Sequence, residues 1–124
     1  MELHESAEMY LETILVLTKK NPNVRSVDIA SEMNFKKPSV SVAMKSLREN
    51  GYININGDGY IALTDKGMQI ANTIYERHEF ISKWLVCIGV DKEIASEDAC
   101  RIEHVISPES FEAVKNYVAN IEKK

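Results

Sequence analysis

Apolar side chains recur three or four residues apart along much of the chain, which is the spacing of helices with one buried face. The first such stretch covers residues 5–20 and carries Leu11, Ile14 and Leu15. It is followed by Asn21-Pro22-Asn23, which ends the pattern because proline lacks the N–H that would continue a helix. The sequence therefore predicts an amphipathic helix over residues 5–20.

Two shorter stretches with the same spacing come next. The first runs from Ser26, whose hydroxyl is expected to cap it, to about Asn34. The second is opened by Pro38, at a first-turn position that tolerates the lost N–H, and it is closed by Asn50-Gly51. The tight turn between them, at residues 34–37, makes the pair a predicted helix-turn-helix.

The spacing then changes to a period of two, which indicates strands. Residues 52–55 and 60–63 alternate in this way and flank Asn56-Gly57-Asp58-Gly59. An Asn-Gly or Asp-Gly turn between two alternating runs is a strong hairpin signal. A hairpin directly after a helix-turn-helix is a wing, so we predict a winged helix-turn-helix domain over residues 1–72.

Helical spacing returns after the hairpin and continues through residues 73–124. A chain of 124 residues can build only a modest core, so a second copy is an expected partner. The fold class is mainly α, with the winged domain followed by a helical region. Three further helices are predicted: from Thr64-Asp65 to about Leu85, from about Glu93 or Ser96 to Val105, and from Ser107-Pro108 to about Ile121.

The distribution of charge along the chain bears on whether the protein binds nucleic acid. The formal net charge of −4 argues against a nucleic-acid partner, since such proteins usually carry a basic face. The segment from Lys19 to Arg48, however, holds seven basic residues against two acidic ones, a net charge of +5. Because this segment coincides with the predicted helix-turn-helix, phosphate groups are its expected partners.

The second helix of the predicted helix-turn-helix presents short polar and basic side chains. Ser39 and Ser41 can reach base edges or phosphates, and the basic side chains suit contacts with the DNA backbone. The alternative is a solvated face on a small helical domain, and the wing signal that follows argues against it. The candidate DNA-binding residues are Arg25, Ser26, Lys36, Lys37, Pro38, Ser39, Ser41, Lys45 and Arg48.

Candidate metal ligands gather near the end of the chain. On a helix, a rotation of about 100° per residue places Cys100, Glu103 and His104 within one arc of roughly 100°. A thiolate, a carboxylate and an imidazole suit a divalent transition metal. The alternative is an exposed Glu and His beside an ordinary buried Cys. If the helices converge, Met9, Glu12 and His78 could reach the same site.

The rest of the sequence indicates the cellular compartment of the protein. No apolar run is long enough to span a membrane, and the N-terminus lacks the pattern of a signal peptide, so we expect a cytoplasmic protein without a membrane partner. In a reducing compartment Cys87 and Cys100 are not expected to form a disulfide. Cys87 lies in the apolar run Trp84–Ile88, where a buried structural thiol is expected.

Enzymatic signatures are missing from the sequence. There is no Cys-x-x-Cys pair, and His78-Glu79 is followed by Ser82 where a metalloprotease motif needs its second histidine. We find no glycine-rich phosphate loop and no Ser, His and Asp arrangement that stands out. The sequence therefore predicts neither catalysis nor a small-molecule substrate.

Several segments together resemble the diphtheria toxin repressor family of iron- and manganese-dependent regulators, over nearly the whole chain. The most specific is the run from Ala99 to Val105, spaced correctly from Arg77-His78. The segments are Glu8-Met9-Tyr10-Leu11, Asp28-Ile29-Ala30, Pro38-Ser39-Val40-Ser41, Leu63-Thr64-Asp65-Lys66-Gly67, Arg77-His78-Glu79, and Ala99-Cys100-Arg101-Ile102-Glu103-His104-Val105 with Ser107.

The resemblance implies a winged-helix DNA-binding domain followed by a helical dimerisation domain over residues 73–124, with a metal bound where the two meet. It is a short form, without the extra C-terminal domain of longer members. By position, the main site would take Met9, Cys100, Glu103 and His104, as in iron-type members, and His78 matches a ligand of both branches. Glu12 matches a carboxylate ligand of the manganese type. The implied metal is Fe(II) first and Mn(II) second, with Co(II), Ni(II) or Zn(II) binding in vitro.

Two positions depart from the iron-type pattern. Ser82 and Ser96 stand where family members carry a carboxylate and a histidine at an ancillary site. That site is therefore not expected in its iron-type form, although His78 and Glu12 could still help to hold a second ion.

The function implied is a repressor that binds an inverted-repeat operator in double-stranded DNA as a homodimer when metal is bound. Three alternatives stay open: a metal-independent winged-helix regulator, a metalloenzyme with an open coordination position, and a structural metal or helical interaction module without a DNA role.

Overall fold

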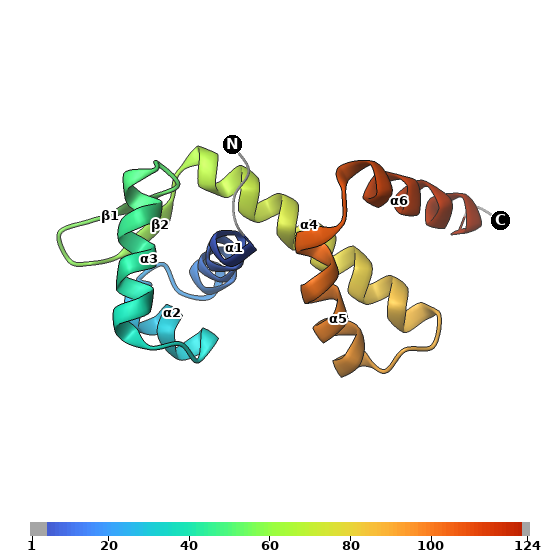
Figure 1. Ribbon diagram of the computed structural model, residues 1–124, viewed down its shortest axis with the longest axis horizontal. Helices are drawn as coiled ribbons and strands as arrows, with labels where there is room; N and C mark the ends of the chain where they lie inside the picture. Colours follow the sequence, from blue (N-terminus) through green and yellow to red (C-terminus); the bar gives the residue numbers. More distant parts are fainter. Residues whose placement is uncertain (1–4, 123–124) are drawn as a thin grey trace. The chain divides into compact units, whose positions relative to one another are not determined.

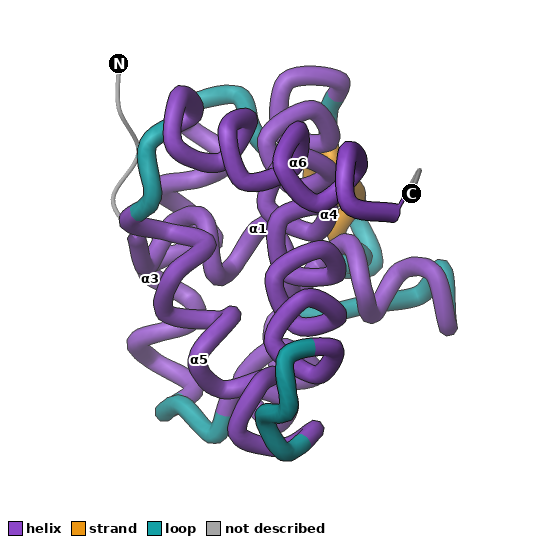
Figure 2. Tube along the Cα trace, turned by 90° about the vertical axis from the view of Figure 1, so that its right-hand side faces the viewer, coloured by secondary structure: helices purple, strands orange, loops and turns teal. Residues whose placement is uncertain are grey.

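The computed structural model describes residues 5–122, which form mostly helix and one small hairpin (Figures 1 and 2). The chain divides into two compact units, Met1–Thr73 and Ile74–Lys124. The mainly helical fold class predicted from the sequence is confirmed. The elements are α1 (Glu5–Lys20), α2 (Ser26–Met33), α3 (Lys37–Glu49), β1 (Ile53–Ile55), β2 (Ile61–Leu63), α4 (Asp65–Cys87), α5 (Lys92–Val105) and α6 (Pro108–Glu122).

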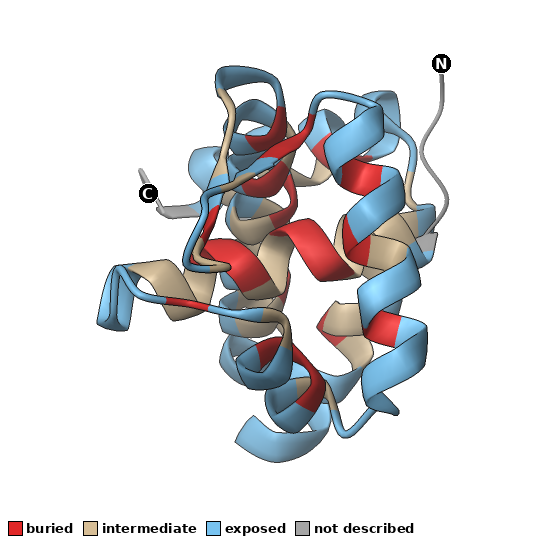
Figure 3. Ribbon diagram, turned by 90° about the vertical axis from the view of Figure 1, so that its left-hand side faces the viewer, coloured by how far each residue is buried: buried red, intermediate tan, exposed pale blue. Residues whose placement is uncertain are grey.

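The first unit is built around a core to which three helices and the hairpin contribute. Figure 3 shows red buried segments interrupted by pale blue exposed ones along the helices, as expected for amphipathic helices. The predicted apolar stripes of α1 and α3 supply much of this core, so the periodicity identified it correctly. Its most deeply buried side chains are Leu11, Ile14, Ile29, Val40, Met44, Ile53 and Ile61.

The helix-turn-helix is formed by α2 and α3, as predicted. Asn34 ends α2 in the left-handed conformation with φ of 57°, which asparagine tolerates better than most residues. The N–H of Phe35 donates to the carbonyl of Ala30 at 3.0 Å and closes the helix end. Pro38 lies in the first turn of α3, where no backbone N–H is needed.

The predicted cap of α2 is wrong. Ser26 is the first helical residue, and Arg25 occupies the N-cap position. The Arg25 N–H donates to the carboxylate of Asp28 at 2.9 Å, the hydrogen bond that the acidic residue of a capping box makes. The start of α2 is therefore fixed by an acid three residues beyond the cap, which accepts the N–H of the cap residue itself.

The wing is an antiparallel pair in which Ile53 lies opposite Leu63, each strand one residue shorter than predicted. In its turn, the Asn56 side-chain oxygen accepts hydrogen bonds from the backbone N–H groups of Asp58 and Tyr60, at 2.9 and 3.0 Å. These two bonds, both made by one side chain of the turn, hold its backbone in place. The predicted Asn-Gly-Asp-Gly hairpin is confirmed.

The second unit consists of α4 from Ile74 onward together with α5 and α6. Ile81, Ala99 and Phe111 form its core, one from each helix. The Phe80 and Phe111 rings meet edge to face with centroids 5.6 Å apart, a favoured geometry for aromatic pairs. This small core ties all three helices together.

The helix ends of this unit lie close to those predicted, and one expectation about burial is wrong. Helix α5 begins at Lys92, one residue before the earlier of the two predicted starts, because the Asp91 carboxylate accepts a hydrogen bond from the Glu93 N–H at 3.1 Å and caps the helix. Cys87 is exposed rather than buried. Helical rotation turns Ile81 and Leu85 toward the core and leaves Val86 and Cys87 exposed.

No helix in the described part of the chain is both long and apolar enough to cross a membrane.

The start of α4 is locked to the chain that enters the wing. Thr64 accepts a hydrogen bond from the Gly67 N–H through its hydroxyl, which also donates to the Gly51 carbonyl at 2.7 Å. The Thr64 N–H donates to the carbonyl of Tyr52 at 3.1 Å. That carbonyl comes so close to buried Gly67 that any side chain there would collide with it.

We therefore expect Gly67→Ala to lower the free energy of unfolding by about 1–3 kcal/mol, as overpacking does. In an unconstrained helix the same change would stabilise the protein by up to about 1 kcal/mol, because alanine is the better helix former. Urea denaturation followed by circular dichroism measures the difference. Gly57→Ala is the control, because a Cβ there meets nothing within 4 Å. An unchanged or raised stability of Gly67→Ala would contradict this account of the junction.

Candidate functional site

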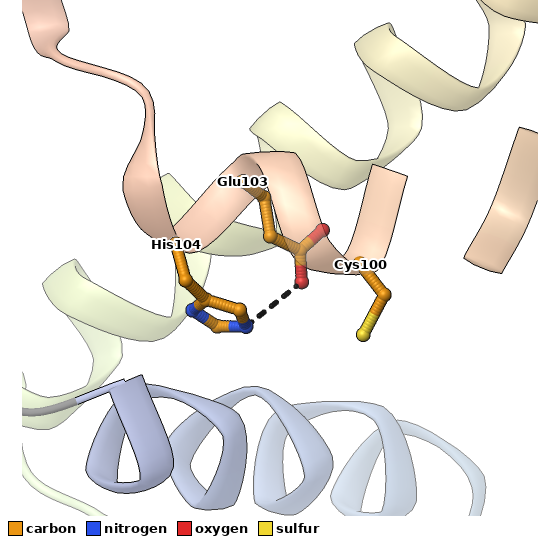
Figure 4. Close-up of side chains that lie close together, drawn as sticks. All are labelled: Cys100, Glu103 and His104. Carbon is orange, nitrogen blue, oxygen red and sulfur yellow. Dashed lines mark ion pairs between the residues drawn. The ribbon is translucent and has the colours of Figure 1, made fainter. Parts of the chain in front are cut away.

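One helix, α5, carries three potential metal ligands on one side. Because Cys100, Glu103 and His104 follow the i, i+3, i+4 spacing, their side chains project in the same direction (Figure 4). Each offers one ligand atom, and these three atoms all lie within 4.8 Å of one another. The arc predicted from the sequence is therefore present in the structure.

The carboxylate of Glu103 is the centre of this group. Its side chain has no exposed surface, although a buried charge is costly unless it is paired. One oxygen, Oε1, lies 3.2 Å from Nε2 of His104, and the other, Oε2, lies 2.8 Å from Nδ1 of His78. The carboxylate is thus held between two imidazoles, one from α5 and one from α4.

The donor set fits a divalent transition metal. Bonds of about 2.0–2.3 Å to nitrogen, oxygen and sulfur place neighbouring ligand atoms roughly 3–4.5 Å apart around one ion. Separations below 4.8 Å therefore need only small side-chain rotations to close on a metal. The thiolate favours ions softer than Mg²⁺ or Ca²⁺, and the neutral imidazole suits zinc, iron, nickel or copper.

The other predicted ligands lie at different places in the chain. His78 is in the second unit, where its ring contacts Glu103, so the structure brings four of the six candidates together. Met9 and Glu12 are half-buried residues of α1 in the first unit. For these two the metal-binding role stays a prediction.

The predicted DNA-binding face occupies the exposed side of α3 and the turn before it. Ser26 is half-buried at the start of α2. Arg25 is exposed, but its Nε donates to the Asp58 carbonyl at 3.1 Å and its guanidinium lies 4.7 Å from the Tyr60 ring centre, so it links α2 to the wing. The exposed candidates are Lys36, Lys37, Pro38, Ser39, Ser41, Lys45 and Arg48.

Sequence reasoning missed Val42 in this face. Its side chain is 71% exposed in the middle of α3, between Ser41 and Lys45 of the candidate set. An exposed apolar residue on a helix that reads DNA can contact the methyl group of thymine. The signal was present in the sequence, because Val42 lies off the stripe formed by Val40, Met44 and Leu47.

Comparisons with known proteins bear on both units. Residues 2–60 match the family described as iron dependent repressor, N-terminal DNA binding domain, and residues 64–124 match the iron dependent repressor, metal binding and dimerisation domain. The chain is 34% identical over 124 residues to an uncharacterized HTH-type transcriptional regulator of Methanocaldococcus jannaschii, covering 98% of this chain and 99% of that protein.

Two further similarities extend to longer proteins. The chain is 33% identical over 107 residues to the iron-dependent repressor IdeR of Mycobacterium tuberculosis, which covers 86% of this chain and 46% of IdeR. The crystal structure of T. acidophilum IdeR superimposes with a TM-score of 0.80 at 25% identity, covering 96% of this chain and 55% of that one. The chain thus spans about half the length of these proteins.

The proposed participation of Cys100 leads to a spectroscopic prediction. Co(II) bound by a thiolate produces a near-ultraviolet charge-transfer band, so we expect this band in the wild type and its loss in Cys100→Ser. The substitution should lower Co(II) affinity by more than the about 10–100-fold that loss of an outer-shell partner costs. Cys87→Ser is the matched control, because Cys87 is exposed at the end of α4. If the band followed Cys87, or survived in Cys100→Ser, the thiolate assignment would be wrong.

Proposed function

The chain belongs to the diphtheria toxin repressor family of iron-dependent repressors, and we propose that it binds an inverted-repeat operator as a homodimer when loaded with Fe(II) or Mn(II). Members of this family are DNA-binding, metal-dependent transcriptional regulators, so the chain is a regulator and not an enzyme. The observation that carries the finer proposal is the group of Cys100, Glu103 and His104 on α5, in the same chain as an exposed helix-turn-helix.

The ligand types support iron over manganese. The Cys100 thiolate, joined by the Met9 thioether in the proposed set, favours Fe(II), Co(II), Ni(II) or Zn(II) over Mn(II). The carboxylate of Glu12 would favour the harder Mn(II), so manganese is the second candidate. Since affinity in vitro follows the intrinsic order of the metals, the ion used in the cell also depends on availability.

The ligands also suggest how metal controls DNA binding. Met9 and Glu12 belong to the first unit, whereas His78, Cys100, Glu103 and His104 belong to the second. We propose that an ion held by the second unit gains ligands from the first, and so raises the population of the DNA-binding arrangement. An ion that gained no ligand in that arrangement would shift nothing, however tightly it bound.

The exposed face of α3 is the proposed contact with the operator. Ser39 and Ser41 would meet base edges in the major groove, and Lys37, Lys45 and Arg48 would meet phosphates. Two copies related by a two-fold axis present two such helices, and an inverted repeat matches them when its half-sites lie roughly 34 Å apart or a multiple of that distance. The repressor would act in the cytoplasm, on chromosomal DNA.

The surface of the second unit supports a homodimer. A pocket of about 570 Å³ between α4 and α6 is lined mainly by apolar side chains, and Ile88 and Ile121 at its rim are 62% and 54% exposed. Apolar patches of this kind commonly mark protein interfaces. We propose a second copy as the occupant, since the matching family description names a dimerisation domain. The lining residues are Phe80, Lys83, Trp84, Cys87, Ile88, Val118 and Ile121.

The proposal is tested by binding to a panel of inverted-repeat DNA at fixed salt, with apo protein and then with reduced Fe(II), Mn(II) or Zn(II). Salt is held constant because phosphate contacts make the affinity steeply salt-dependent. We expect metal to raise operator affinity at least about fivefold, within the usual range of allosteric coupling. Cys100→Ala with His104→Ala should abolish that gain. Lys37→Glu with Lys45→Glu should weaken binding with any metal, whereas Lys92→Glu on α5 should not.

The same samples report the oligomeric state by sedimentation equilibrium. Trp84→Glu places a charge in the proposed dimer surface and should give monomers, whereas Met68→Glu, a partly exposed residue in the first unit, should leave dimers. Equal operator binding with and without metal would leave a metal-independent winged-helix regulator. Dimers unaffected by Trp84→Glu would show that the copies meet elsewhere.

A further inference from the structure

The last turn of α5 is held by a residue outside that helix. Nη1 of Arg77, on α4, donates hydrogen bonds to the carbonyl oxygens of Glu103 and Ile106, at 3.1 and 3.2 Å. The final carbonyls of a helix have no partner within the helix, and they carry its partial negative charge. A guanidinium suits this position because it is cationic and presents rigid, planar donors.

Arg77 is itself held in place by the core of the second unit. Its guanidinium carbon lies 5.5 Å from the centre of the Phe111 ring, a cation–π contact. Phe111 is buried in the core with Ile81 and Ala99, and it packs edge to face on Phe80. The Arg77 guanidinium thus contacts Phe111 of α6 and at the same time holds the end of α5 by hydrogen bonds.

Two neighbouring residues of α4 therefore act on the same glutamate. Arg77 binds its backbone carbonyl, and His78 contacts its carboxylate at 2.8 Å. His104 follows Glu103 directly, so the turn that Arg77 closes contains both of these ligand candidates. Release of that turn would let the two side chains move relative to Cys100, one helical turn earlier.

From this geometry we propose that Arg77 is a positioning residue of the metal centre: it fixes the last turn of α5 so that Glu103 and His104 face the ion together with Cys100. This inference rests on the proposed metal-binding role of those three residues. Arg77 touches no ligand atom of the trio in this arrangement, and its effect passes through the backbone.

A purely structural role of Arg77 is separated from positioning by a matched variant. Lys115 of α6 also lies over the Phe111 ring, at 5.4 Å, and it bridges to Glu76 of α4 at 2.6 Å. The hydrogen bond that Lys115 donates to the Glu76 carboxylate raises the pKa of Lys115, so this cation stays charged. Lys115→Gln thus removes a cation from the same ring without touching a carbonyl of α5.

The experiment compares Arg77→Gln, Arg77→Lys and Lys115→Gln by thermal unfolding of the apo protein and by Co(II) titration. We expect lower Tm values for Arg77→Gln and Lys115→Gln. Only the Arg77 variants should bind Co(II) more weakly, by about 10–100-fold for Arg77→Gln, as for other groups that orient metal ligands. They should also change the Co(II) d–d spectrum, which reports ligand geometry. Arg77→Lys keeps the charge without the planar donors, so its affinity for Co(II) should lie between those of the wild type and Arg77→Gln.

Wild-type affinity and spectrum in Arg77→Gln would overturn the inference, and so would an equal loss in Lys115→Gln. If Arg77→Gln does not fold, Arg77→Lys carries the test, and a wild-type spectrum and affinity there would overturn it equally. Failure of the proposed function would give a different experimental result from failure of this inference. Wild-type protein would then bind Co(II) through Cys100 without any gain in operator binding, and that result leaves the role of Arg77 intact.

Discussion

The buried carboxylate of Glu103 is the constraint on which the site in the second unit depends. A charge without exposed surface must be paired, and here an imidazole lies at each oxygen, one from His78 and one from His104. The same three groups are among the proposed ligands of a divalent ion. Since the ligand atoms of Cys100, Glu103 and His104 already lie within 4.8 Å of one another, little rearrangement is needed to accept a metal. The packing of α4 against α5 is therefore part of the chemistry as well as part of the fold.

Much of the fold was predictable because the local signals agree with one another. Period-3.6 and period-2 patterns, Pro38 in a first turn and the Asn56–Gly59 turn all appear where the sequence indicated. The trio on α5 was equally predictable, since three residues of one helix depend only on helical geometry. Contacts between helices could not be predicted in this way, because they depend on how the helices pack. The sequence indicated Arg77 only as part of the Arg77-His78-Glu79 segment. No periodicity in the sequence shows that its guanidinium reaches two carbonyls of α5.

The wrong expectations have local causes of the same kind. The apolar run around Cys87 predicted burial, yet the unit has too few elements to cover every face of α4, and the run lines a surface pocket. At α2, the helix begins one residue earlier than expected, so Ser26 is its first residue and Asp28 accepts the N–H of the N-cap residue Arg25. The exact first residue of a helix is decided by side-chain geometry that residue type alone does not specify. The errors therefore concern details of ends and faces, and the order of the elements was correct.

The central claim is that metal binding and operator binding are coupled within one chain. Coupling is reciprocal, so the factor by which metal tightens DNA binding must equal the factor by which DNA tightens metal binding. The most direct test is therefore a Mn(II) titration followed by electron paramagnetic resonance, with and without saturating operator DNA, at one salt concentration. The account predicts tighter Mn(II) binding on the operator, by the same factor that Mn(II) adds to operator affinity. A Mn(II) affinity that operator DNA leaves unchanged would contradict it.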